Sequence, residues 1–165
     1  MTKYLLGFVA VVGIAALPSS ATADSTESVL KALSGYDSAV TVEGLEKLAG
    51  SQDALVASLL VLRHKEDGSV PPYVSVRAER LLLQFAGRED VQAALEEDLQ
   101  SEQWFGLARI VVVHLDTVSD AAARSRLAKA ALDRAAREQR FTTYGRMLRD
   151  SSDPEVSRMA REALE

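Results

Sequence analysis

Two histidines are the side chains of this chain best suited to acid–base chemistry or metal binding. His64 lies in the segment Leu62-Arg63-His64-Lys65, and His114 follows a run of three valines. A zinc site needs several ligands at short spacings, and neither histidine has a second His or Cys three or four residues away. We therefore expect both histidines to be structural and predict neither a metal nor a cofactor.

Other catalytic patterns are missing from the sequence as well. It contains no Gly-x-Ser-x-Gly nucleophile motif, no Gly-x-Gly-x-x-Gly loop and no P-loop. The carboxylate run 96–98 cannot place two acids on one face, because consecutive helical residues point in different directions. We interpret it as a solvated charge run. The sequence thus predicts no catalytic residue, and a protein that is not an enzyme.

Short helices are the elements expected to position any binding surface, because Ala, Leu, Glu and Arg dominate the chain. Capping residues, glycines and prolines mark their ends. The expected helices are 24–34 with a capping box at Asp24, 41–49 capped by Thr41 and ended by Gly50, 51–64 capped by Ser51, 73–86, 89–99, 104–118, 119–138 capped by Ser119, 141–149, and 154–165 capped by Asp153.

The segment 104–118 is ambiguous between a helix and a strand. Its run Ile110-Val111-Val112-Val113 is β-branched, which is typical of a buried strand. Its length and its helical neighbours favour a buried helix.

The first 23 residues are typical of a secretory signal peptide. Lys3 precedes an uncharged apolar run, Pro18 ends it, and Ala21-Thr22-Ala23 gives the small-x-small pattern of a cleavage site. The run is shorter than the roughly 20 residues that a membrane-spanning helix needs. We predict cleavage after Ala23, one domain over 24–165, a periplasmic or secreted location, and no stable membrane anchor after cleavage.

The net charge of −5 argues against non-specific binding to nucleic acid. Basic residues gather in the C-terminal third of the chain, where a solvated face is the simpler interpretation. The alternative is a basic patch for an anionic partner, next to an aromatic anchor. The candidate partner-binding residues are Arg124, Arg126, Arg137, Arg140, Tyr144 and Arg146.

An internal repeat links two C-terminal segments. Residues 125–132 and 157–164 are 32 positions apart, and five of the eight paired residues are identical. Spacings of 30 to 47 residues are typical of helical-hairpin repeats. The irregular spacing to weaker matches upstream leaves open another helical repeat or a plain helical bundle.

The segment 153–164 resembles the second helix of a HEAT repeat. It has the acidic-Pro start, then Val156, then Arg, Ala and Leu at helical spacing, and residues 73–82 fit the same pattern less well. The resemblance covers about two thirds of the chain after residue 23. It implies an all-α fold of short stacked antiparallel hairpins, an α-solenoid, in which scaffold or adaptor work is done without catalysis.

Two functional hypotheses follow. The first is an exported HEAT-repeat-like interaction module that binds a protein or peptide, with arginines pairing with its acidic or phosphorylated groups. The second is a structural or regulatory helical-bundle subunit of a periplasmic assembly. Its partner would cover the apolar edge at 104–118 or the C-terminal end.

Overall fold

Helices make up all the regular secondary structure in the part of the chain that the structure, a computed structural model, describes: residues 20–35, 40–64 and 69–164. The α-helices are α1 (Ser20–Ser34), α2 (Val42–Ala49), α3 (Gln52–Arg63), α4 (Pro72–Leu82), α5 (Glu89–Gln100), α6 (Phe105–Val113), α7 (Ala121–Arg137), α8 (Thr142–Arg149) and α9 (Pro154–Leu164). Short 3₁₀ turns follow α4 and α6 and precede α8. The all-α prediction is confirmed.

Local capping signals account for most helix ends. The side chains of Thr41 and Ser51 accept hydrogen bonds from the backbone N–H groups of the first turns of α2 and α3, as expected. Asp153 does the same for the start of α9. The predicted cap at Ser119 is wrong by one residue, because Asp120 accepts the bond from the backbone of α7 instead.

The expected start of the first helix is also wrong. α1 already begins at Ser20, and Asp24 lies inside it, where its carbonyl accepts a bond from the Ser28 hydroxyl. Residues 1–19, which carry most of the predicted signal peptide, lie outside the described residues, so export stays a prediction. Within the described ranges, no helix has both the length and the apolar character needed to cross a membrane.

The ambiguous segment 104–118 is helical. α6 buries Leu107, Ala108, Val111 and Val112, which the spacing of a helix places on one side. A 3₁₀ turn over Leu115–Thr117 follows it directly. Tertiary packing therefore overrides the strand preference of the β-branched run.

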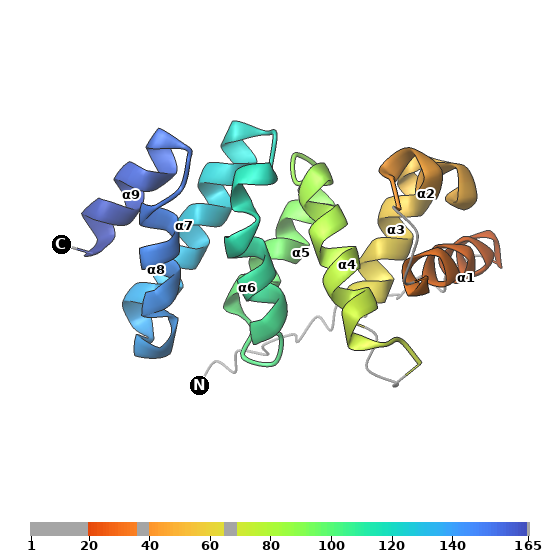
Figure 1. Cartoon of the computed structure of the whole chain (residues 1–165), viewed down its shortest axis with the longest axis horizontal. Coiled ribbons are helices and arrows are strands. Elements are labelled where there is room, and N and C mark those ends of the chain that lie inside the picture. Colours follow the sequence, from red (N-terminus) through yellow and green to blue (C-terminus); the bar gives the residue numbers. More distant parts are fainter. Residues whose placement is uncertain (1–19, 36–39, 65–68, 165) are drawn as a thin grey trace, which may run out of the picture.

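The helices pair along the chain, and each pair packs on the next. α3 contacts α4, α5 contacts α6, and α7 contacts α8. Between pairs, α4 contacts α6 and α6 contacts α8, while α3 contacts α5 and α5 contacts α7. Figure 1 shows α4, α6 and α8 side by side and running in the same direction, with α1 and α2 at one end of the long axis and α9 at the other.

One continuous apolar core runs through the described elements from Val29 on α1 to Ala160 on α9.

Two arginines form hydrogen bonds with the C-terminal ends of neighbouring helices. Arg77 on α4 donates from Nη1 to the carbonyls of Leu33 and Gly35 at the end of α1, at 2.6 and 2.7 Å. Arg134 on α7 donates to the carbonyls of Leu99 and Ser101 at the end of α5, at 2.7 and 2.8 Å. Both satisfy carbonyls that a helix leaves without an internal partner.

Gly50 ends α2 in a left-handed conformation, with φ +89°, and its N–H bonds to the carbonyl of Glu46. We expect Gly50→Ala to lower the free energy of unfolding by about 1 kcal/mol, because a Cβ is strained at this φ. Gly106→Ala is the matched control. It lies inside α6 with open space around it and should be neutral or stabilising. Urea titration measures both, and equal losses would contradict the strain argument.

Candidate functional site

Four ionisable side chains from three helices meet inside the fold, next to the end of α3. Asp98 on α5 accepts hydrogen bonds from Arg63 Nη1 and contacts His64 Nε2, both at the end of α3. Arg63 also donates to the carbonyl of Ala94 at 2.8 Å and pairs with Glu97 at 3.1 Å. Glu79 on α4 completes this group. We call Arg63, His64, Glu79 and Asp98 the buried cluster.

Glu79 holds a proton at neutral pH. Loss of solvation by burial, then the charge of Asp98 and a hydrogen bond with it, raise the pKa of Glu79 to about 9, while the charge of Arg63 opposes the change. Neither carboxyl oxygen of Glu79 accepts a bond from another described side chain or backbone group. A protonated Glu79 resolves this, because it can donate to Asp98.

The buried cluster has the chemistry of an acid–base pair but not the access that catalysis needs. Glu79 and Asp98 are both 0% exposed. A reacting group must come within hydrogen-bond reach of a catalytic acid or base. In this conformation nothing outside the protein can do so, and the cluster fastens α3, α4 and α5 to one another.

Trp104 connects the buried cluster to the surface. Its ring stacks on His64, with centroids 4.3 Å apart and an interplanar angle of 9°. Trp104 also lines a hollow of about 330 Å³ between the starts of α4 and α6, together with Val70, Val76 and Leu107. This first hollow is mainly apolar.

A second hollow of about 340 Å³ lies between the far ends of α6 and α8. Val112, Val113, Met147 and Leu148 form its apolar part, and Asp116, Asp150 and Ser151 form its polar part. Asp116 is held by the hydroxyls of Ser151 and Ser152. The two hollows therefore flank α6 on opposite sides and at opposite ends.

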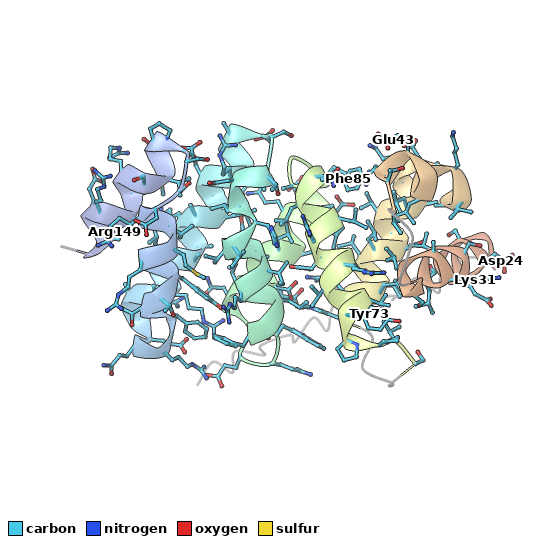
Figure 2. All side chains as sticks on the ribbon, in the orientation of Figure 1. Asp24, Lys31, Glu43, Tyr73, Phe85 and Arg149 are labelled. Atoms are coloured by element: carbon cyan, nitrogen blue, oxygen red, sulfur yellow. The ribbon has the colours of Figure 1, made fainter. Side chains whose placement is uncertain are left out.

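The outer surface of α4, α6 and α8 exposes large apolar side chains beside these hollows. Val76 is 37% exposed, Phe105 43%, Val113 48% and Met147 37%. We call this surface the α4–α6–α8 face. Figure 2 shows Tyr73 and Phe85 at the two ends of the α4 segment, which fixes its direction along this face.

The structure does not gather the candidate partner-binding residues on one open surface. Arg124 and Arg126 point to opposite sides of α7, the first pairing with Asp153 before α9 at 2.5 Å and the second with Glu96 on α5 at 3.3 Å.

Arg137 donates to Gln100 on α5, and Arg140 pairs with Glu102 and Glu138. Tyr144 is only 2% exposed, and its hydroxyl donates to the carbonyl of Phe105 at 3.4 Å. It packs in the core, the default expectation for an aromatic side chain. Of the five candidate arginines, Arg146 alone has neither an ion pair nor a hydrogen bond among the described residues, and it is exposed.

The interpretation of 96–98 as a solvated run is wrong for Asp98. Glu97 is exposed, with 67% of its side chain open to solvent, but Asp98 is fully buried. The burial of Asp98 could have been predicted from its spacing in the sequence. Asp98 follows Val91 and Leu95 on the apolar stripe of α5, where a charged side chain needs a buried partner.

His114 is partly buried at the end of α6. Burial, together with the positive charge of Arg80 on α4, lowers the pKa of His114 and favours its neutral form. Across the described ranges, no three His, Asp or Glu side chains are grouped as metal ligands would be.

Comparisons of this chain with protein-family models, with curated proteins and with solved structures give no significant match.

Proposed function

We propose that this protein is an exported, HEAT-like α-solenoid that binds a protein or peptide partner and has no catalytic role. One observation carries the proposal. The pairs α3–α4, α5–α6 and α7–α8 pack on one another, α4 against α6 and α6 against α8, and no other described element covers the outer side of these three helices. Stacked hairpins create extended surfaces of this kind, which such proteins use for binding.

The contact pattern favours a repeat over a plain bundle. In the described ranges the middle pair contacts both neighbouring pairs, whereas α4 has no extensive contact with α8 and α3 has none with α7. A repeat array predicts this, because each unit contacts only its neighbours. An up-down bundle instead places its helices around one shared core.

The exposed apolar residues support binding as the role of the array. On α6, Val113 lines the second hollow, and Phe105 is 43% exposed although its ring also packs against Phe141 and Tyr144. The enclosure of Glu79 and Asp98 supports a role without catalysis, since this pair of carboxyl groups is out of reach of a substrate.

Site-resolved photo-crosslinking in cells that produce the full chain tests this function. A photo-reactive residue at Phe105 or Val113 should give an adduct of one fixed mass, because a partner covers this surface. Leu48 on α2 and Val61 on α3 are matched controls, since both are exposed apolar residues away from the α4–α6–α8 face. Absence of an adduct at 105 and 113, or identical adducts at all four positions, would contradict the proposal.

A further inference from the structure

The helices of the α4–α6–α8 face carry more basic than acidic side chains in a protein that is acidic as a whole, while Asp116 and Asp150 line the second hollow beside them. The three helices contribute five arginines, and the only carboxyl group among them belongs to Glu79. Glu79 is fully buried and retains its proton, so it does not offset these arginines at neutral pH. The rest of the chain supplies the excess of acid behind the net charge of −5.

Three of these arginines are exposed and have no ion-pair or hydrogen-bond partner in the described part of the chain. They are Arg80 on α4, Arg109 on α6 and Arg146 on α8. Arginines elsewhere are engaged: Arg63 with Asp98, Arg124 with Asp153, and Arg126 with Glu96. Arg161 on α9 is also exposed and unpartnered, and it lies outside this face.

The apolar residues and the cations of α6 alternate along one stripe. Phe105, Arg109 and Val113 are exposed at spacings of four, which places them in line on one side of a helix. The first hollow lies beside the start of this stripe and the second beside its end. Arg109 therefore lies between the mainly apolar first hollow and the second hollow, which has both an apolar and an acidic part.

Resting on the binding function proposed above, we propose that the α4–α6–α8 face binds an extended acidic segment of a partner protein. Two apolar side chains of the segment occupy the two hollows, and carboxylates between them pair with Arg109 and with Arg80 or Arg146. Arginine suits this role because its planar guanidinium binds a carboxylate through two hydrogen bonds.

Helix geometry sets the spacing of the two apolar anchors. The hollows are separated by about 10 Å along α6, from a rise of 1.5 Å per residue, and by about one interhelical distance of 9 Å across it. The diagonal of about 13 Å equals roughly four residues of an extended chain. The segment therefore has apolar residues at positions i and i+4, with acidic residues between them.

A protein segment fits this face better than an anionic membrane does. The hollows, of about 330 and 340 Å³, are each large enough to take in an apolar side chain. Three free arginines are few for a membrane surface, which recognises clusters of basic residues and would repel a chain of net charge −5. A second copy of this chain could also cover the α4–α6–α8 face, and the test must distinguish it from a partner segment.

Fluorescence anisotropy with synthetic peptides tests the proposal on the full chain. The probe is a labelled peptide with two leucines four residues apart and glutamates at the three positions between them. The comparison peptide has glutamines at those three positions. We expect Arg109→Glu to weaken binding of the acidic peptide at least tenfold, because it replaces attraction with repulsion at the centre of the site. The matched control Arg161→Glu makes the same charge change on α9 and should leave affinity within twofold.

Each outcome decides the question. Tight binding of the acidic peptide, lost in Arg109→Glu and retained in Arg161→Glu, supports the proposal. Equal binding of the glutamine peptide, equal losses in the two variants, or no binding at all overturns it. The crosslinks at 105 and 113 would still stand in that case, so failure of this inference is distinguishable from failure of the binding function.

Two further measurements exclude other occupants. Co-sedimentation with phosphatidylglycerol vesicles that is lost in Arg109→Glu would identify a lipid surface instead. A dimer in light scattering that Arg109→Glu dissociates would identify a second copy of the chain. Either result overturns the acidic-segment proposal, and the absence of both together with selective peptide binding supports it.

Discussion

Arg63→Met should lower the free energy of unfolding by roughly 3–5 kcal/mol, the usual loss when one member of a buried ion pair is removed. Asp98 is fully buried and Arg63 nearly so, and without Arg63 the buried carboxyl group of Asp98 keeps only its contacts with His64 and Glu79. Such a loss is a large fraction of the 5–15 kcal/mol that stabilises a typical domain. Urea unfolding followed by circular dichroism measures it.

The matched control is Arg126→Met, which breaks an ion pair between helices at the surface. Arg126 and Glu96 join α7 to α5 with solvent access to both, so we expect a loss below about 1 kcal/mol. Should Arg63→Met prevent folding, the double variant Arg63→Met with Asp98→Asn provides the second measurement. It removes the unpaired charge and should recover part of the stability. Equal losses in the two single variants would contradict the role of the buried pair.

Glu79→Gln should stabilise the protein, and the gain should grow with pH. The native state raises the pKa of Glu79 from 4.5 to about 9, so it holds a proton that the unfolded chain has released. Unfolding therefore releases a proton within this window. The contribution of this group to stability is complete below pH 4.5 and is lost as pH rises toward about 9, at about 1.4 kcal/mol per pH unit. Glutamine cannot ionise, and its amide can still donate to Asp98.

The measurement compares unfolding free energies of the two proteins at several pH values within this window. The expected result is a difference that widens steadily toward alkaline pH. Glu97→Gln is the matched control, because it removes an exposed carboxylate beside the same Arg63. The difference in unfolding free energy between Glu97→Gln and the unmodified protein should stay nearly constant across this pH window. A constant difference for Glu79→Gln as well would show that Glu79 is ionised in the native state.

Local patterns in the sequence were sufficient to predict the positions of most of the helices. Thr41, Ser51 and Gly50 act within a few residues of their own positions, so their types determine the ends of α2 and α3. The start of α1 was missed because a good acceptor at Asp24 does not end a helix when the residues before it also adopt helical geometry. At 104–118, length and burial decided the outcome over β-propensity.

The buried cluster depends on information that local patterns do not contain. Asp98 and Arg63 are 35 residues apart and come from different helix pairs. Periodicity could place Asp98 on the inner side of α5, but it could not say which side chain from α3 or α4 lies opposite. The same limit applies to the α4–α6–α8 face, because only the stacking of the pairs brings together the helices that carry Arg80, Arg109 and Arg146.

Trp104 lies between the buried cluster and the first hollow. It is the single tryptophan of the chain, it stacks on His64 of the buried cluster, and it lines the first hollow. Its fluorescence is therefore an intrinsic reporter that needs no label. The imidazole of His64 quenches this fluorescence while the two rings are stacked, so the intensity reports whether the buried cluster is intact. The emission wavelength reports whether water or an apolar group of a ligand occupies the first hollow.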